Sequence, residues 1–361
     1  MEVQAAFLLP DATGLPHEQA MRAALEYAAH GSRGATPLVG AVLLPLHSGP
    51  IVGFHAGAGT AHAEAAALDF AQANGVDTAG ATMVVTLEPC SHSGRTGPCT
   101  QRIIDAGITH AVIATADPNP AARGGADVLR AAGIAVTTGV LAGEAEALNA
   151  RWLLAVRAGR PFITCKIAQS IDGCSAAADG TSQWITGEEA RSHAHGIRAK
   201  VDAIAVGTGT ALADNPRLSA RLETAAVTSQ PIPVVIGRRP LPPESNLAQN
   251  PQTITAETID EALTKLKAAR VEHLLVEGGP RLVGSFIGRG LADELLVYQA
   301  PVLLGDGLRS TAGLNVTTLL DAHAFTLDAA SAAHPNPQVL GADVLLRLTP
   351  AEKGHHVHRN H

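Results

Sequence analysis

The sequence predicts two α/β domains that follow one another along the chain. Its 361 residues fit two domains, since a domain usually has about 100–200 residues. Hydrophobic residues make up 46% of the chain, which is enough for two ordinary cores. Aromatic residues make up only 3%, so these cores must be aliphatic. Strand-like and helix-like segments alternate in both halves, a pattern typical of sheets covered by helices.

The alternation in the first half predicts a three-layer sheet with helices on both faces. Apolar segments predict strands at Val39–Leu44 and from Ile51, Met83, His110 and Ile134. Segments rich in helix formers predict helices at 19–31, from Ala61 to Gly75, from Cys99 to Gly107 and from Ala126. A last helix from Glu144 ends at a Gly-Arg-Pro break, so we place the domain boundary near residue 150.

A second alternation fills residues 151–349. Strands are predicted from Pro161, Ala203, Pro233, His273 and Glu294, and helices at 187–200, 258–269 and 280–290. Residues 350–361 hold four of the sixteen histidines. We expect them to form a mobile tail without a catalytic role.

Charge and composition exclude several classes of function. The formal net charge is −7, and no dense run of lysine and arginine is present, which argues against a nucleic-acid partner. The N-terminal M-E-V-Q-A-A-F-L-L-P-D lacks the basic segment of a signal peptide, and no stretch is long and apolar enough to span a membrane. We therefore expect a cytoplasmic protein with a small-molecule substrate. Self-association is expected only because homo-oligomers are common.

Two of the four cysteines lie in one polar loop, T-L-E-P-C-S-H-S-G-R-T-G-P-C, which begins at Thr86. Cys90 and Cys99 each follow a proline. Structural disulfides are rare in a reducing compartment, so the loop favours metal binding or catalysis over a disulfide. Upstream, His62 and Glu64 form an H-x-E pattern. Residues two apart do not share a helix face, so this pair can serve one site only at the start of an element.

These residues predict a catalytic zinc site. His62, Cys90 and Cys99 supply three ligands, and a catalytic zinc keeps its fourth position open for water. Cys99 opens a helix, whose partial positive charge lowers the pKa of a thiol. Glu64 lies beside the site without being a ligand and can carry protons, as in zinc deaminases. A structural zinc site is the alternative, because H-x-E alone or two cysteines alone are weak signals.

The spacing of eight residues between the cysteines differs from the two of nucleoside and nucleic-acid deaminases. The segment P-C-S-H-S-G-R-T-G-P-C closely resembles the deaminase half of the bifunctional riboflavin-biosynthesis deaminase/reductase family. The resemblance extends over nearly the whole chain. The other matching motifs are Val39-Gly40, H-A-E at His62, T-L-E-P-C at Thr86, D-P-N-P at Asp117, Leu148-Asn149, S-I-D-G at Ser170, S-Q-W-I-T at Ser182, G-T-G-T-A-L-A-D-N-P at Gly207, V-E-G-G-P at Val276 and A-P-V-L-L-G at Ala300.

This resemblance implies a cytidine-deaminase-like α/β/α domain over residues 1–150 and a dihydrofolate-reductase-like α/β domain over residues 151–349. The first would use zinc on His62, Cys90 and Cys99, with Glu64 in proton transfer, to deaminate 2,5-diamino-6-(5-phosphoribosylamino)pyrimidin-4(3H)-one. The second would use NADPH to reduce the ribosyl group of 5-amino-6-(5-phosphoribosylamino)uracil to ribityl.

The resemblance also implies contacts in the second domain. NADPH would contact Ala168, Trp184, Thr210, Asp214, Gly279, Pro280, Arg281, Leu282, Val283, Gly284 and Ser285. The substrate would contact Ser182, Arg198, Leu218, Arg221 and Glu277. Taken alone, E-G-G-P before a helix can hold a phosphate at the helix start, and a pair of arginines can hold one by bidentate bonds. The G-T-G-T stretch fits a tight turn as well as a cofactor contact, and the two arginines alone would fit surface ion pairs. The G-x-G-x-x-G motif of a Rossmann site is absent.

Two places depart from the family pattern. Thr36 stands where the family has asparagine, and Gly237-Arg238 stands where an acidic residue is common. We hypothesise that Arg238 contacts the additional phosphate of NADPH.

Three other functions are possible for a chain with these motifs. Charge and scarce aromatics oppose a nucleic-acid-editing deaminase, and Glu64 opposes a non-catalytic zinc-binding regulator. An enzyme with a single working half stays open.

Overall fold

A computed structural model describes residues 5–8, 15–31, 36–57, 59–91, 97–119, 122–221, 230–328 and 335–351. The chain divides into two compact units. Unit 1 comprises Met1–Ala158 and Ser331–Ala333, and unit 2 comprises Gly159–Ala330 and His334–His361. The main division thus falls between Ala158 and Gly159, at the Gly-Arg-Pro break of the sequence. Most of the expected tail, residues 352–361, lies outside the described residues.

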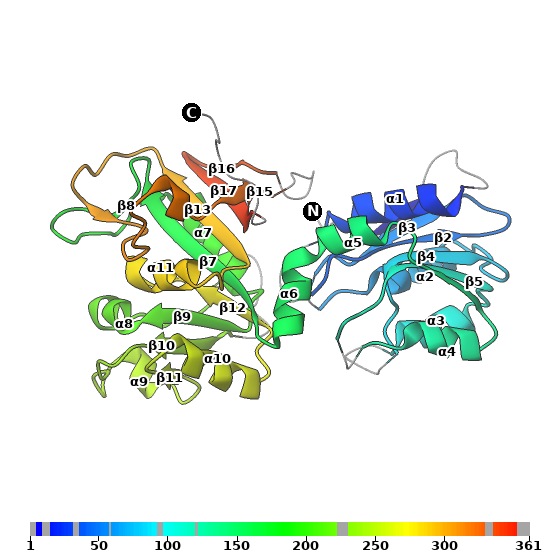
Figure 1. Ribbon diagram of the computed structural model, residues 1–361, viewed down its shortest axis with the longest axis horizontal. Helices are drawn as coiled ribbons and strands as arrows, with labels where there is room; N and C mark the ends of the chain where they lie inside the picture. The colour runs from blue at the N-terminus through cyan, green and yellow to red at the C-terminus, as the bar shows by residue number, and fades with distance from the viewer. Residues whose placement is uncertain are drawn as a thin grey trace. The chain divides into compact units, whose positions relative to one another are not determined.

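Unit 1 is built on a six-stranded sheet with the order β1-β3-β2-β4-β5-β6 (Figure 1). Its strands are β1 (Ala6–Leu8), β2 (Gly40–Leu44), β3 (Ile51–Phe54), β4 (Thr82–Leu87), β5 (His110–Thr115) and β6 (Ala135–Thr138). Its helices are α1 (His17–Ala28), α2 (Ala63–Ala73), α3 (Cys99–Asp105), α4 (Gly125–Ala131), α5 (Ala142–Leu148) and α6 (Ala150–Ala158). Strands β2 and β3 form the predicted hairpin, and β4, β5 and β6 run parallel.

The sheet of unit 1 separates two apolar clusters, as a three-layer fold requires. Successive side chains of a strand point to opposite faces. Met83 therefore enters the cluster that includes Ile103 of α3, whereas its neighbour Val84 enters the cluster that includes Met21 of α1. Figure 1 shows α1 and α5 on one face of this sheet and α3 and α4 on the other. The predicted three-layer α/β/α arrangement is confirmed.

Two helix predictions in unit 1 need correction. The helix expected at 19–31 ends at Ala28. A Cβ at Gly31 would overlap the carbonyl oxygen of His55, so this glycine is required by close backbone approach rather than as a helix cap. The single helix expected from Glu144 is two helices, α5 and α6, which meet at Asn149. The side chain of Asn149 is engaged elsewhere, with the backbone of Leu38.

Unit 2 is built on a nine-stranded sheet with the order β11-β10-β9-β12-β7-β13-β17-β15, in which β16 also pairs with β17. Its strands are β7 (Phe162–Ser170), β9 (Ala203–Gly207), β10 (Ile232–Ile236), β11 (Ile254–Ala256), β12 (His273–Val276), β13 (Glu294–Ala300), β15 (Phe325–Leu327), β16 (Gln338–Leu340) and β17 (Asp343–Pro350). A separate two-stranded sheet joins β8 (Cys174–Ala176) and β14 (Leu308–Arg309).

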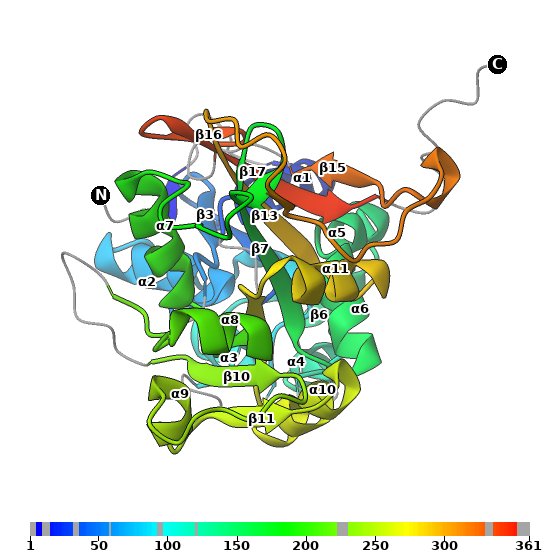
Figure 2. The same ribbon diagram turned by 90° about the vertical axis from the view of Figure 1, so that its left-hand side faces the viewer.

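Helices cover both faces of the large sheet. They are α7 (Glu188–Arg198), α8 (Thr208–Asp214), α9 (Asn246–Gln249), α10 (Ile259–Ala268) and α11 (Pro280–Gly288), and a 3₁₀ turn spans Leu319–Asp321. Residues of α10 and α11 share one apolar cluster, and residues of α7 and α8 share another. Figure 2 shows α7 on the left of β7 and β13 and α11 on the right. No helix in the described ranges has the length and apolar character needed to cross a bilayer.

The prediction for unit 2 missed parts of the chain. Strand β17 pairs antiparallel with β13, beyond the last strand expected from the sequence. The G-T-G-T stretch forms the start of α8, although glycine is a poor helix former. Helix α8 packs on β9 and β10, and tertiary contacts of this kind override the helix propensity of single residues. The remaining strands and helices expected in unit 2 are confirmed, with ends shifted by up to three residues.

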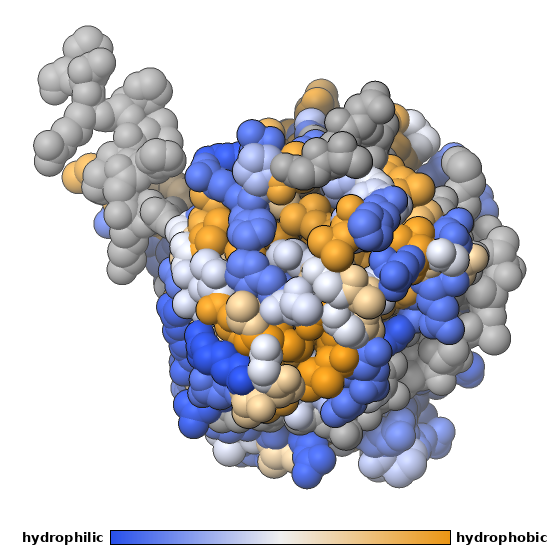
Figure 3. Space-filling model, turned by 90° about the vertical axis from the view of Figure 1, so that its right-hand side faces the viewer, coloured by the Kyte–Doolittle hydropathy of each residue, from blue (hydrophilic) through white to orange (hydrophobic). Residues whose placement is uncertain are grey.

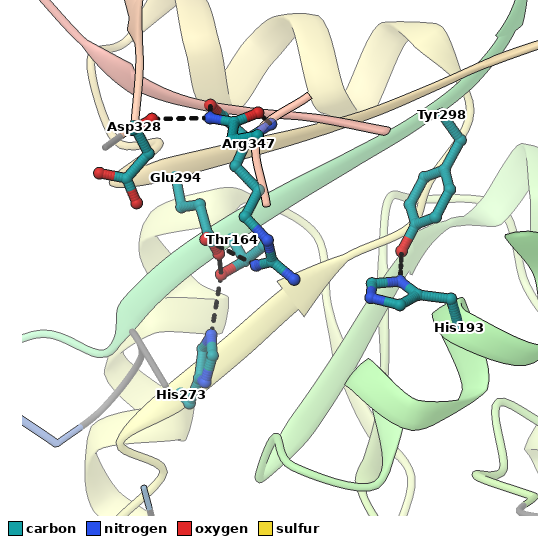
Figure 4. Close-up of polar contacts among 8 residues, drawn as sticks. Thr164, His193, His273, Glu294, Tyr298, Asp328 and Arg347 are labelled. Carbon is teal, nitrogen blue, oxygen red and sulfur yellow. Dashed lines mark hydrogen bonds and ion pairs between the residues drawn. The ribbon is translucent and has the colours of Figure 1, made fainter. Parts of the chain in front are cut away.

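A chain of polar side chains crosses the interior of unit 2 (Figure 4). Nε2 of His273 lies 2.8 Å from Oγ1 of Thr164, which donates to Glu294 at 2.9 Å. The second oxygen of Glu294 accepts from Arg347 at 3.4 Å. The Thr164 hydroxyl has one proton, which it gives to Glu294, so His273 must be the donor in its bond with Thr164. The neutral Nε2–H tautomer is thereby selected. Burial lowers the pKa of His273 to about 4.

Large apolar side chains reach the surface at scattered positions. In the described part of unit 1, those more than a third exposed are Leu8, Leu46, Val128 and Leu154. Figure 3 shows one face, on which apolar patches are separated by polar residues.

Candidate active sites

The first candidate site gathers three side chains from separate elements of unit 1. His62 is the N-cap of α2, Cys99 is the first residue of α3, and Cys90 follows β4. Nδ1 of His62 lies 3.4 Å from Sγ of Cys99 and 3.7 Å from Sγ of Cys90. All three possible ligand atoms lie within 4.8 Å of one another. The H-x-E pattern is at the start of a helix, as its spacing requires.

Each of these positions has a local cause. The backbone N–H of Cys99 donates to Sγ of Cys90 at 3.4 Å, because residues that open a helix have no intrahelical acceptor for their N–H groups. The backbone N–H and the hydroxyl of Thr100 both donate to the carbonyl oxygen of Cys90, at 3.2 and 3.3 Å. The starts of α2 and α3 and the segment after β4 therefore bring His62, Cys99 and Cys90 together.

The two cysteine side chains share one proton. The hydrogen bond between them lowers the pKa of Cys90 to about 4, against the opposing effect of burial, and raises the pKa of Cys99. A cation bound by both sulfur atoms would displace this proton. Glu64 belongs to the first turn of α2 and is only 3% exposed. Burial raises the pKa of Glu64, although the neighbouring His62 opposes this shift. A raised pKa favours the protonated carboxyl group, which can then release its proton to a leaving group.

The cluster fits zinc by the chemistry of its donors. Two sulfur atoms and one imidazole nitrogen are the soft and borderline ligands that zinc prefers, and three protein ligands are typical of a catalytic zinc site. In the described residues, the group of converging ligand atoms comprises His62, Cys90 and Cys99 and does not include Glu64. The carboxyl group of Glu64 interacts electrostatically with His62 and Cys90 and by a side-chain hydrogen bond with Cys99, so it lies beside the ligand group, where proton transfer requires it.

Glu88, in the T-L-E-P-C motif, connects the segment before Cys90 to two neighbouring backbone segments. One oxygen of its buried carboxylate accepts from the backbone N–H of Asp117 at 3.1 Å, and the other accepts from Ala126 at 2.9 Å. A Cβ at Gly125 would overlap the carbonyl oxygen of Pro89. The segment that carries Cys90 is therefore packed directly against the start of α4.

Asn149 holds the loop that contains Thr36. Its side chain accepts from the backbone N–H of Leu38 at 2.8 Å and donates to the carbonyl oxygen of Leu38 at 2.9 Å. Oγ1 of Thr86 accepts from the N–H of Gly40 at 3.1 Å. The loop leading into β2 is thereby attached both to the junction of α5 and α6 and to β4. Sequence reasoning matched Asn149 to the family pattern but did not predict this contact.

The second candidate site lies at the carboxyl ends of parallel strands in unit 2. Strands β9 and β12 are adjacent. Helix α8 begins directly after β9, and α11 begins after the three residues that follow β12. Gly207 and Gly279 are the N-caps of these helices, and neither forms a side-chain cap bond. Oγ1 of Thr210 accepts from the N–H of Gly279 at 3.0 Å, which joins the two helix starts. The partial positive charge at a helix start suits the phosphates of a dinucleotide.

A charged group occupies the same end of the sheet. Arg198 on α7 binds Glu277 by two bonds, from Nε at 2.9 Å and from Nη2 at 2.6 Å. Lys166 on β7 was missed by sequence reasoning. Cys165 pairs with Val276 in register, so Lys166 and Glu277 follow at the same level of the sheet. A charged residue within the apolar run F-I-T-C-K-I-A is the signal that could have identified Lys166.

The charged groups of this site shift the pKa values of their neighbours. Burial alone would raise the pKa of Glu277, but the bonded Arg198 and the nearby Lys166 outweigh burial, and the pKa falls below its ordinary value. Burial lowers the pKa of Lys166, and Arg198 lowers it further, while Glu277 opposes this shift. The site thus holds a carboxylate with a lysine and an arginine close to it.

The other predicted contacts of unit 2 have varied surroundings. Trp184 is 70% exposed, and the guanidinium of Arg191 lies 4.8 Å from its ring centre. Leu218 is buried, whereas Ser182 and Asp214 are exposed. Ala168 lies on β7 and is partly buried. The predicted segment from Gly279 to Ser285 comprises the N-cap and the first six residues of α11.

The Gly237-Arg238 departure has a structural reason. Gly237 has a φ of +139°, and a Cβ there would lie 2.7 Å from Oγ1 of Thr208, so only glycine fits. The side chain of Arg238 is 80% exposed and lies 3.5 Å from Glu257. Its contact with the additional phosphate of NADPH stays a prediction.

Comparisons with known proteins identify both units. Residues 16–115 match the family described as cytidine and deoxycytidylate deaminase zinc-binding region, and residues 161–333 match the RibD C-terminal domain. The riboflavin biosynthesis protein RibD of Corynebacterium ammoniagenes is 49% identical to this chain, over 88% of this chain and 95% of that protein. The chain belongs to the RibD family. The RibD of Escherichia coli K12 is 36% identical, over 92% of this chain and 99% of that protein.

Solved RibD structures agree with this membership. Acinetobacter baumannii RibD has a TM-score of 0.71 at 33% identity, over 93% of this chain and 99% of that chain. The deaminase/reductase of Thermotoga maritima has a TM-score of 0.68 at 30% identity, over the same shares of the two chains. As a member of this family, the chain is an enzyme of riboflavin biosynthesis with a zinc-dependent deaminase and an NADPH-dependent reductase. The predicted family, fold and two activities are confirmed.

Proposed function

We propose that unit 1 deaminates 2,5-diamino-6-(5-phosphoribosylamino)pyrimidin-4(3H)-one and that unit 2 reduces the product, 5-amino-6-(5-phosphoribosylamino)uracil. The observation that carries the first assignment is the convergence of His62, Cys90 and Cys99 beside buried Glu64. This group lies in the residues that match the zinc-binding deaminase region. The second assignment rests on the group around Arg198 and Glu277, which lies in the residues that match the RibD C-terminal domain.

In unit 1, His62, Cys90 and Cys99 are the proposed zinc ligands. Bound zinc lowers the pKa of water, which makes hydroxide available near neutral pH. Deamination adds water to the amino-bearing ring carbon and releases ammonia, so a proton must move from the water to the departing nitrogen. Glu64 is the proposed carrier, because burial raises the pKa of its carboxyl group toward the working range. The loop held by Asn149 is proposed to orient the pyrimidine.

In unit 2, NADPH supplies a hydride when bound, and the chain supplies binding and orientation. The start of α11, from Gly279 to Ser285, and Thr210 are proposed to hold the cofactor, with Ala168, Trp184 and Asp214 as further contacts. The proposed substrate contacts are Ser182, Arg198, Leu218, Arg221 and Glu277. Support for Glu277 comes from its low pKa, since a carboxylate can accept hydrogen bonds from ribosyl hydroxyl groups.

Two matched glutamine variants test these assignments. Glu64→Gln should reduce ammonia release by roughly 10²–10⁴-fold, the usual contribution of acid–base catalysis, and leave reduction of the deaminated substrate intact. Glu277→Gln should impair that reduction and leave ammonia release intact. Each variant serves as the folding control for the other. Loss of both reactions in either variant, with normal folding by circular dichroism, would refute the division of labour.

The cellular setting is part of the same proposal. All four cysteines are unpaired, which fits the reducing cytoplasm. The substrate is a small phosphorylated molecule, and no nucleic-acid or membrane partner is proposed. Self-association is proposed on base rates alone and is checked by analytical ultracentrifugation.

A further inference from the structure

The two arginines of the reductase site differ in what they already bind. Arg198 gives two bonds to Glu277, and its Nη1 also donates to the carbonyl oxygen of Ser219 at 3.3 Å. Its side chain is only 21% exposed. Most of its donors are therefore engaged within the protein. A dianionic phosphate would have to compete with the carboxylate of Glu277 for this guanidinium.

Arg221 is engaged differently. It is exposed and forms no ion pair with an acidic side chain in the described ranges. Its Nη2 lies 3.4 Å from Nε2 of His195, a residue of α7 one helical turn before Arg198. A guanidinium only donates hydrogen bonds, so Nε2 of His195 must carry a lone pair here. His195 is therefore neutral in this contact, with its proton on Nδ1.

The surroundings of His195 favour this neutral form. Burial lowers the pKa of His195, and the positive charges of Arg198, Arg221 and Lys166 lower it further, while Glu277 opposes them. Nδ1 is buried and has no hydrogen-bond partner in the described chain. A buried donor without an acceptor is destabilising, so it indicates a ligand or a functional constraint at this place. Sequence reasoning did not single out His195.

We propose that His195 is a positioning residue that holds Arg221 ready for the phosphate group of the reductase substrate. Arg198, by contrast, orients Glu277. This inference rests on the proposed reductase function and refines it, because it divides between two arginines a task that sequence matching assigned to both. An exposed arginine loses rotamer freedom when it binds a phosphate, and a bond that holds it beforehand reduces that loss.

Two substitutions of His195 separate a positioning role from a packing role. Glutamine places its terminal amide near the position of Nε2 and can accept from Arg221, whereas asparagine is too short to do so. In NADPH oxidation with the deaminated substrate, His195→Asn should raise KM roughly tenfold with kcat within a factor of two. His195→Gln should restore most of the wild-type KM. Equal KM values for these two variants would overturn the proposal.

The action through Arg221 is tested by combining substitutions. Arg221→Ala should raise KM more than His195→Asn does, and the double variant should match Arg221→Ala within a factor of two. Multiplying effects would mean that His195 acts independently of Arg221 and would overturn the proposal. The exposed His323→Gln serves as the control for a histidine change in unit 2.

A binding measurement without turnover completes the test. Calorimetry compares ribose 5-phosphate with ribose as matched probes. His195→Asn should weaken ribose 5-phosphate binding roughly tenfold, as Arg221 loses its fixed orientation, and leave ribose binding unchanged. Unchanged binding of ribose 5-phosphate would overturn the proposal even if the wild type reduces its substrate. A wild type that oxidises no NADPH with the deaminated substrate would instead refute the reductase function itself.

Discussion

Replacing His273 with glutamine keeps a donor for Thr164 but removes a ring that titrates. The histidine is 7% exposed and belongs to the buried polar chain of Figure 4. Burial lowers its pKa to about 4 from an ordinary value of 6.5. Below pH 6.5, His273 is therefore protonated in the unfolded chain but stays neutral in the folded chain until the pH approaches 4. The stability that depends on neutral His273 is complete above this pH and is lost as the pH falls from 6.5 toward 4.

The size of this effect follows from the two pKa values. A shift of one unit corresponds to about 1.4 kcal/mol, so the full difference of 2.5 units corresponds to about 3.4 kcal/mol, reached below pH 4. Between pH 7 and pH 5 the expected loss is about 2 kcal/mol. The His273→Gln variant lacks this loss. Other groups titrate in the same range, but they contribute equally to both proteins and cancel in the difference.

Urea unfolding followed by circular dichroism at pH 7, 6 and 5 measures this difference. The free energy of unfolding of the wild type, minus that of His273→Gln, should fall by about 2 kcal/mol between pH 7 and pH 5. The exposed His323→Gln serves as the control for a histidine replacement elsewhere in unit 2. A difference that stays constant within about 0.5 kcal/mol across this range would refute a neutral buried His273.

Three further substitutions test how the sites are supported. Asn149→Ala removes both hydrogen bonds to the backbone of Leu38. In an ammonia-release assay, the KM for deamination should rise roughly tenfold, while the reductase activity stays unaffected. An unchanged KM would contradict this expectation. Gly125→Ala should displace Pro89 and lower the zinc content measured by atomic absorption, whereas full zinc occupancy would show that the loop can adjust. Thr210→Val removes the acceptor at the start of α11; NADPH binding measured by fluorescence should weaken roughly fivefold, and equal binding would remove Thr210 from the cofactor site.

Local signals were sufficient to predict most elements of the fold. Strands such as β4 are continuous apolar runs, and helices such as α2 and α3 are followed by glycines with positive φ, Gly75 and Gly107. The convergence of His62 with the two cysteines was also predictable. An H-x-E pair at a helix start and a Pro-Cys at another impose strong geometric limits on where the side chains can point.

Other features depend on contacts between distant segments and had no local signal. The break between α5 and α6 coincides with Asn149, whose side chain bonds the backbone of Leu38, more than a hundred residues earlier. The place of β17 in the sheet, between β13 and β15, depends on its pairing with both strands. The differing roles of Arg198 and Arg221 depend on their partners, Glu277 and His195, and side-chain partners cannot be read from one sequence.

The most direct test of the central claim, that one chain deaminates and then reduces, is a single time course with the zinc-loaded wild type. The diaminopyrimidinone substrate and NADPH are mixed, and ammonia release and NADPH oxidation are followed together. The account predicts that ammonia appears first and that NADPH oxidation follows with a lag, which vanishes when the deaminated substrate is supplied instead. NADPH oxidation without prior ammonia release would contradict the account.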